Sequence, residues 1–530
     1  MLTKKWKIAT LLIFIGVVGT ESLWAQSDIV QNAKNLEEIT ITIDEAIQIA
    51  LINNYMIRKG LLDIETAESQ IREAWGSVYP QVNTAGSYTR NLQTPNPFAG
   101  SDAGGLFETL GAIDWLAYNE SARTDGDPNT APIPIDEFFD RQRQGFEDAG
   151  LGVPGFGSGN PFAVENQFEF GLSVTQTLYN GAAFAAIRGA RQVRELNEDQ
   201  TELDRQIVVD QIKNSFYTAL LAREQYQVLK ASVERLRETV EETRKSVDAG
   251  MLSRFDRISA EVELVNLETR LIEVENQSEL AIKNLALQLG IPTRSKLNLR
   301  GALEFDESLL PDTFDPDLAY EVALQQRPDL SQTAGLIELL KVEGEMTRSG
   351  YMPTLSAFAN AAYIGQVPSN RTSVMAVEGE EFTYRSESRS FFDNSYWNPA
   401  VAVGLRFNWS IFNGFQTRMR VEQNAISVRQ AEIDREFQKN AIYLEIEQTV
   451  RSLETALRRI NSQQRNIEQA ELNYEFALKR LTEGVGTPLQ ERQASSLLDQ
   501  SRVNYLTAVY DYLIALSQYE KAIGKPILND

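Results

Sequence analysis

The sequence of 530 residues repeats itself. The stretch TLYNG at residues 177–181 recurs as SIFNG at residues 410–414. Other pairs recur in the same order: Ala50-Leu51 with Ala323-Leu324, Pro80 with Pro353, Gly171-Leu172 with Gly404-Leu405, Gly250 with Gly484, and Gly290 with Gly524. A repeat of this length predicts that the chain folds as two copies of one structural unit.

Each copy predicts the same elements: an opening helix, a strand, a loop, a second strand, a long helix and a return helix. The first opening helix starts at a capping box of Thr42 and Glu45, and the second at Asp315 followed by Pro316. The long helices are expected over about residues 182–248 and 415–482, and the return helices over about 253–289 and 487–523. Pro80 and Pro353 are expected to end the opening helices.

The N-terminal residues predict a secretory signal peptide, because lysines precede an apolar run and Ala25 offers a small residue for cleavage. Gln26 stands where a lipoprotein needs Cys, so we expect an exported protein without a lipid anchor. The expected segments are a signal peptide at 1–25, a first repeat at 26–291 with a loop at 92–166, a linker at 292–315, and a second repeat at 316–530 with a loop at 364–397.

Composition excludes several classes of function. The formal charge is −23, and −25 once residues 1–25 with three Lys and one Glu are removed, so nucleic acid is not an expected partner. The absence of Cys and His removes thiol chemistry and the commonest general base and metal ligand. We find no clustered carboxylates for a hydrolase, and we therefore predict no enzyme activity, no cofactor and no metal site.

After the signal peptide, no apolar run reaches the roughly 18 residues of a membrane-spanning helix, so a membrane crossing would need strands. The predicted strands alternate: Phe168, Phe170 and Leu172 share one face, as do Val401, Val403 and Leu405. A half-buried strand of a soluble sheet has the same period. Four strands are too few for a barrel, which needs about eight, whereas three copies of the chain supply twelve.

The helices agree with a trimer in their lengths. Each long helix spans roughly 100 Å and each moderate one about half of that, so three copies provide twelve columns of equal height. The first return helix carries two apolar stripes: Ile258, Val262, Val265, Thr269 and Ile272, and Leu264, Leu267, Leu271 and Val274. A helix in a closed ring has two neighbours and needs two stripes, although a soluble bundle also buries broad faces.

Several motifs together resemble the TolC-type outer membrane efflux protein family: RPDL at residues 327–330, the two strand-to-helix turns, EGVGTPLQ at residues 483–490, and the tandem repeat. The resemblance implies a homotrimer with a twelve-stranded β-barrel in outer-membrane lipid and a twelve-column α-helical barrel in the periplasm of a Gram-negative cell. It implies a passive exit duct of a tripartite efflux or type I secretion system, with a periplasmic adaptor and an inner-membrane transporter as partners. The alternative is an exported soluble coiled-coil scaffold or adaptor-like protein.

The resemblance also implies a periplasmic aperture lined by acidic rings. Asp256 matches one aperture position of the family, whereas Gln490 and Gln493 stand where well-known members have Asp. Glu483 and Glu491 lie nearby in the sequence. Asp256 and Gln490 also suit a second role, as partners of the N-caps Ser253 and Thr487, which we expect to be their main one. The turn residues singled out are Asn180, Gly181, Asn413 and Gly414 between strand and helix, and Gly250, Gly484 and Gly486 at the tips.

Residues 94–165 hold 12 acidic and 3 basic residues with many Gly and Pro, so we expect a mobile extracellular loop. The alternative is a plug over the channel mouth made by its aromatic residues Phe138, Phe139, Phe146 and Phe156. The aromatic residues that flank the second hairpin suit an interfacial girdle: Phe391, Phe392, Tyr396, Trp397 and Trp409.

Overall fold

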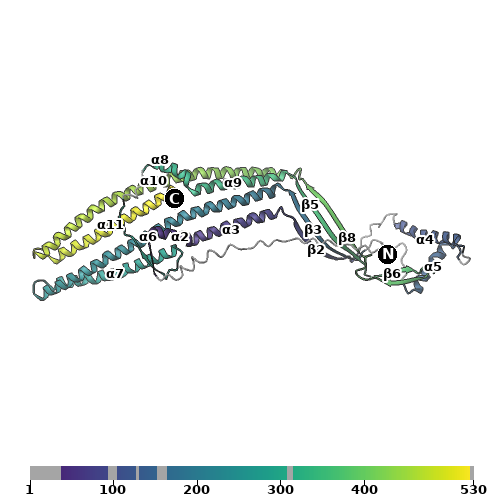
Figure 1. The fold of residues 1–530 in the computed structure, drawn as a ribbon, viewed down its shortest axis with the longest axis horizontal. Coiled ribbons are helices and arrows are strands. Elements are labelled where there is room, and N and C mark those ends of the chain that lie inside the picture. The colour runs from purple at the N-terminus through teal and green to yellow at the C-terminus, as the bar shows by residue number, and fades with distance from the viewer. Residues whose placement is uncertain are drawn as a thin grey trace, which may run out of the picture. The chain divides into compact units, whose positions relative to one another are not determined.

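The computed structural model describes residues 38–93, 104–126, 130–151, 164–306, 314–369 and 371–525 (Figure 1). The expected signal peptide and Phe156 lie outside the described residues. The chain divides into a helical unit, made of residues 1–72, 187–344 and 420–530, and a sheet unit, made of residues 73–186 and 345–419. Each repeat contributes to both units, so the compact units do not follow the repeat boundaries.

The long and return helices have nearly the expected bounds. The long helices are α6 (Gly181–Asp248) and α10 (Gln416–Thr482), with 68 and 67 residues. The return helices are α7 (Arg254–Gln288) and α11 (Pro488–Ala522), with 35 residues each. Each return helix runs back along its long helix (Figure 1). Among the described residues, no helix is long and apolar enough to cross a membrane.

Each opening helix, expected as one, is two helices. The first copy has α2 (Ile43–Asn53) and α3 (Tyr55–Gly76), and the second has α8 (Pro316–Gln326) and α9 (Pro328–Arg348). Pro328 biases Arg327 toward extended backbone, at φ −75° and ψ 119°. Asn54 is also non-helical, and its side chain accepts the N–H of Met56 at 2.8 Å. Both second helices end before Pro80 and Pro353; α9 passes into the short helix η2 (Ser349–Tyr351).

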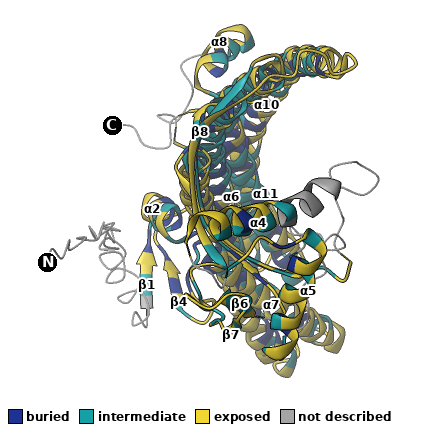
Figure 2. Cartoon of the chain, turned by 90° about the vertical axis from the view of Figure 1, so that its right-hand side faces the viewer, coloured by how far each residue is buried: buried dark blue, intermediate teal, exposed yellow. Residues whose placement is uncertain are grey.

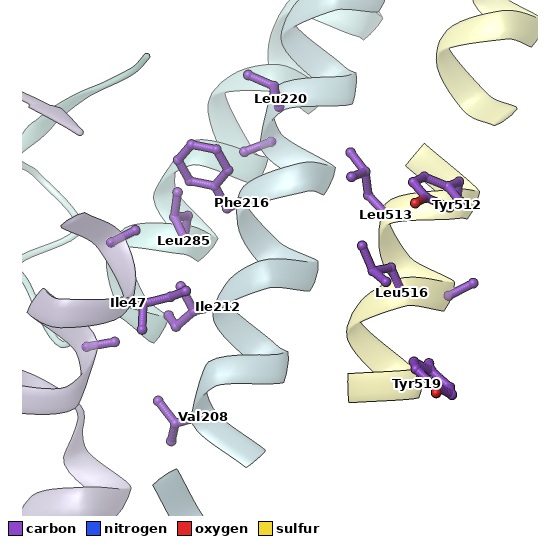
Figure 3. Close-up of a cluster of buried hydrophobic side chains, with 14 of the residues drawn as sticks. Ile47, Val208, Ile212, Phe216, Leu220, Leu285, Tyr512, Leu513, Leu516 and Tyr519 are labelled. Carbon is purple, nitrogen blue, oxygen red and sulfur yellow. The ribbon is translucent and has the colours of Figure 1, made fainter. Parts of the chain in front are cut away.

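The core of the helical unit lies where α2, α6, α7, α10 and α11 meet. Figure 3 shows Ile212 and Phe216 of α6 beside Ile47 and Leu285, with Leu516 on α11. Two short parallel strands, β1 (Glu38–Ile41) and β4 (Lys296–Leu299), pack on this core. The strand β4 lies in the stretch that the sequence analysis assigns to a linker, because four residues are too few to show a period.

Each break in an opening helix lies against the end of a return helix. Gly290 has φ +73°, and a Cβ there would overlap the backbone oxygen of Asn53. Gly524 has φ +69°, and a Cβ there would lie 3.0 Å from the backbone nitrogen of Arg327. The side chain of Asn54 donates to the carbonyl of Gln288 at 2.7 Å, which satisfies one of the terminal carbonyls of α7. We call the contact between such a break and the end of a return helix a break junction; the chain has one in each repeat.

Arg327 makes the equivalent bond in the second junction. Its Nη1 donates to the carbonyl of Ala522 at 2.9 Å and to Glu445 at 2.8 Å, while Nη2 pairs with Asp329 at 2.8 Å. Burial raises the pKa of Asp329, but the hydrogen bond and charge of Arg327 outweigh it and hold the pKa below its ordinary value. Arg327 therefore links α8, α9, α10 and α11 at one point.

The sheet unit contains a four-stranded antiparallel sheet with the order β2-β3-β5-β8. Its strands are β2 (Gln81–Arg90), β3 (Asn166–Tyr179), β5 (Thr354–Val367) and β8 (Trp397–Asn408). The register aligns Val82, Val174, Ala359 and Val403 in one row, and Asn83, Ser173, Asn360 and Ala402 in the next. Because neighbouring rows point to opposite sides, one face is apolar and the other polar. We call them the apolar face and the polar face.

The prediction that residues 94–165 form a loop is wrong for the described part of this segment. This part forms α4 (Gly104–Thr124) and α5 (Ile135–Asp148), and the second hairpin loop carries the strands β6 (Thr372–Ala376) and β7 (Tyr384–Ser388). The rings of Phe138 and Phe382 are 5.5 Å apart, and those of Phe146 and Tyr384 stack at 4.1 Å. Aromatic residues from both repeats thus form a small core, which the local Gly, Pro and Asp content does not reveal.

The two kinds of glycine predict different effects of substitution. Gly250 has φ +76° with nothing within 4 Å of a Cβ, so Gly250→Ala costs only the left-handed backbone, roughly 1–2 kcal/mol. Gly290→Ala adds a clash with the backbone of Asn53, and we expect a loss of more than about 3 kcal/mol. Thermal unfolding followed by circular dichroism in detergent measures both. Equal melting temperatures for the two variants would contradict the junction.

Candidate functional site

The helical tips, where each long helix turns into its return helix, hold most of the residues singled out from the sequence. After α6, Gly250 has positive φ, its N–H bonds the carbonyl of Val247 at 2.9 Å, and the N–H of Met251 bonds that of Ser246 at 2.8 Å. After α10, Gly484 has φ +73°, and the N–H of Gly486 bonds the carbonyl of Arg480 at 2.8 Å. Both turns satisfy the terminal carbonyls through a left-handed glycine.

Asp256 and Gln490 complete the capping boxes of α7 and α11, one in each tip. Ser253 accepts the N–H of Asp256 at 3.2 Å, and the Asp256 carboxylate accepts from the Ser253 hydroxyl at 2.6 Å and from its N–H at 3.2 Å. These hydrogen bonds, first that from the side chain, hold the pKa of Asp256 below its ordinary value. Thr487 and Gln490 form the same reciprocal pair. The expected capping role is confirmed.

The other tip residues divide by exposure. Glu483, Gln490 and Gln493 are exposed, whereas Glu491 is only 6% exposed. Glu491 lies in the first turn of α11, one residue after Gln490, on the side that packs against α6 and α7. The structure therefore separates Glu491 from the exposed polar residues with which the sequence analysis grouped it.

A polar cavity of about 360 Å³ lies between α6, α7 and α11 beside Glu491. Arg492 is 6% exposed, and its Nε lies 3.1 Å from Glu263 of α7. Two helical turns further along α11, Asp499 pairs with Arg235 of α6 at 2.5 Å and accepts from the Ser232 hydroxyl. These ion pairs connect the second tip hairpin to the first.

Glu491 is the poorly compensated member of this cluster. Its Oε2 has no hydrogen-bond partner among the described residues, and the same holds for Nη1 of Arg492. Burial raises the pKa of Glu491, Arg492 and Arg235 oppose the shift, and Glu242 and Glu263 add to it. Burial raises the pKa of Tyr474 on α10, and the negative charge of Glu491 raises it further. The ionised form of Glu491 is therefore disfavoured in the folded tip.

The residues singled out from the sequence do not include Arg235, Glu263, Arg492 and Asp499. A signal was available, because Arg492 and Asp499 are seven residues apart and interrupt the apolar spacing of α11. Polar residues at such positions of a coiled coil usually meet partners on neighbouring helices. The sequence does not identify those partners, since they lie more than 200 residues away.

The two strand-to-helix turns share the sequence Asn-Gly but differ in conformation and contacts. In the first, the side chain of Asn180 accepts the N–H of Ala182 at 3.1 Å, and a Cβ on Gly181 would lie 2.8 Å from the side chain of Ser349. In the second, Gly414 has φ +65° and the amide of Asn413 donates to Thr417 at 2.5 Å. The first glycine permits a close approach, and the second permits a left-handed backbone.

The sequence matches the model of the outer membrane efflux protein family over residues 150–291 and 319–525. Two similar proteins come from Pseudomonas aeruginosa. The alkaline protease secretion protein AprF is 19% identical over 348 residues, which cover 65% of this chain and 67% of that protein. The pyoverdine export outer membrane protein OpmQ is 21% identical over 363 residues, which cover 68% of this chain and 69% of that protein.

The fold also matches solved structures. One of them is a crystal structure of CusC, which concerns the conformational changes that accompany folding and transmembrane channel formation. It superposes with a TM-score of 0.62 at 16% identity, and the match covers 91% of this chain and 92% of that one. The family match and the shared fold agree with the duplicated order of elements. The chain therefore belongs to the outer membrane efflux protein family: it is an outer-membrane exit duct for efflux or secretion, with its helical part in the periplasm, and not an enzyme.

Proposed function

We propose that three copies of this chain assemble into a passive duct with a twelve-stranded barrel and twelve helical columns. The observation that carries this proposal is the open sheet. In the described residues, β2 and β8 are the first and last strands of the order β2-β3-β5-β8, and each pairs on one side only. In lipid, every unpaired backbone group costs several kcal/mol. Pairing β8 of one copy with β2 of the next removes both edges.

The apolar face of the sheet suits contact with lipid. Val401 and Val403 on β8 are 77% and 78% exposed, and Phe170 on β3 and Val82 on β2 are exposed beside them. The rows from Val82 to Tyr88 on this face contain no charged residue. Phe168, Tyr363 and Trp397 cluster at one end of the face, as an aromatic girdle requires. An exported soluble scaffold would leave this face unexplained.

The first return helix supplies the helical interface. Leu264 and Leu267 pack against Leu236 and Val240 of α6 within one copy. The other stripe, represented by Val262 and Val265, has no partner in the copy described and is 50–60% exposed at Ile258, Val262, Val265 and Ile272. Most of α7 is accordingly coloured as exposed in Figure 2. We assign this stripe, the α7 stripe, to the neighbouring copy in the ring.

The tips form the periplasmic aperture in this proposal. Asp256, Glu483, Gln490 and Gln493 are accessible at the tips and are the candidates to line it. Glu491 instead acts as a packing residue between the two tip hairpins, because it is buried against α6 and α7. The aperture thus carries fewer carboxylates than the family pattern implies.

The partners we propose are a periplasmic adaptor and an inner-membrane transporter, which supplies the energy. The relatives named for protease secretion and pyoverdine export support both. Their cargoes differ, so the fold itself does not select one. The net charge of −23 gives no basis for nucleic acid as a partner.

The α7 stripe predicts a substitution that separates the copies. Val265→Glu places a charge in the proposed interface while leaving the single chain intact, since Val265 is 60% exposed there. The wild-type protein should have the mass of a trimer by light scattering corrected for bound detergent, and the variant should dissociate. Asn266→Glu, one residue away on an exposed position, is the matched control and should stay trimeric. A trimeric Val265→Glu variant, or a wild-type monomer that is soluble without detergent, would refute the assembly.

Glu491 predicts a dependence of tip stability on pH. Because its folded pKa is raised, the folded tip holds the proton more tightly than the unfolded chain, and stability falls as pH rises through the folded pKa. The folded pKa values of Asp256 and Asp329 are lowered. Their contribution to stability is therefore lost only as pH falls below the ordinary Asp pKa, outside this window. Glu491→Gln should therefore raise the melting temperature by roughly 1–3 °C at pH 7.5 and by less at pH 5.

The control for this prediction is Glu483→Gln, which removes an exposed carboxylate of the same tip. It should leave the pH dependence as in the wild type. A Glu491→Gln variant with the wild-type dependence would show that the ionised carboxylate is compensated in the folded tip.

A further inference from the structure

We propose that Arg406, supported by Phe358, forms a cationic ring in the lumen of the trimer that binds organic carboxylates on their way out. This inference rests on the proposed function, in which the polar face of the sheet lines the lumen. Each copy contributes one Arg406, so the ring has three guanidinium groups related by the three-fold axis.

Phe358 holds the arginine at a defined place on the polar face. Phe358 of β5 pairs with Gly404 of β8, and a Cβ at Gly404 would lie 2.8 Å from Cζ of the Phe358 ring. The missing Cβ lets the ring lie across β8. The guanidinium carbon of Arg406, two residues further along β8, lies 5.3 Å from the ring centroid. A cation over an aromatic face at this distance is attracted to it.

Arg406 has few competing interactions. Among the described residues, no carboxylate lies within ion-pair distance of it, and its row partners Ser356 and Thr177 are uncharged. The other charged residue on the polar face of the described sheet is Glu169, which pairs with Ile364, eight residues along β5 from the partner of Arg406. At about 3.3 Å per residue, this places the two charges roughly 26 Å apart along the strand.

The chemistry of the guanidinium decides the ligand class. Its N–H groups match a carboxylate in a bidentate geometry, and the contact with Phe358 uses the face of the guanidinium and not these N–H groups. A cationic ring in a narrow lumen with low-dielectric walls also concentrates anions, which the overall charge of −23 repels elsewhere. The ring therefore favours organic anions over cations at the point where β8 approaches α10.

The test uses reconstituted wild-type channels in planar bilayers, with benzene-1,3,5-tricarboxylate as the probe. This anion carries three carboxylates in three-fold symmetry and is added to each side in turn, so that it reaches the barrel without crossing the tips. We expect it to block the wild-type current, and Arg406→Gln to raise the half-blocking concentration by about tenfold or more. Arg406→Lys should retain most of the block, and Phe358→Leu should weaken it by a few fold.

Glu169→Gln is the matched control, because it removes the other charge of the same face. It should not weaken the block. Equal block of the wild type and Arg406→Gln, or no block of a conducting wild-type channel, would overturn the ring while leaving the duct intact. A wild-type protein that forms no channel would overturn the proposed function, and the ring with it.

Discussion

One copy of this chain leaves the backbone of its sheet incomplete. In the described residues, β2 and β8 each present a row of N–H and C=O groups without a partner strand. In our proposal these edges lie in hydrocarbon, which offers no water, and they pair with strands of neighbouring copies. The helix α7 is also incomplete in one copy, because one of its apolar stripes packs on α6 whereas the α7 stripe is exposed. In our proposal both surfaces are completed by the same neighbour.

The duplication is maintained by geometry more than by residue identity. Both break junctions need a return helix to end against a gap in the opening helix, and both use a glycine with positive φ for the close approach. The bond to the end of the return helix comes from Asn54 in one repeat and from Arg327 in the other. Arg327 is long enough to reach Asp329 and Glu445 as well, which makes the second junction a meeting point of four helices.

Carboxylates at the tips have opposite electrostatic roles. Asp256 is stabilised as an anion by the Ser253 cap, whereas Glu491 is destabilised as an anion by burial. The first is compatible with a surface that solvent and ions reach. The second is compatible with a contact between tip hairpins that is sensitive to its charge state. Arg406 adds a charge of the other sign within the sheet, where Phe358 supports it without neutralising it.

The sequence by itself determined the elements whose causes are local. The capping boxes of Thr42, Ser253 and Thr487, the ends of the long helices at Gly250 and Gly484, and the strand alternation all depend on residues within a few positions of each other. Only the tertiary structure decided the pairing of β1 with β4, the aromatic core of α4, α5, β6 and β7, and the burial of Glu491. Those features are stabilised by contacts between residues far apart in the chain, and a local sequence pattern does not show which distant residues will meet.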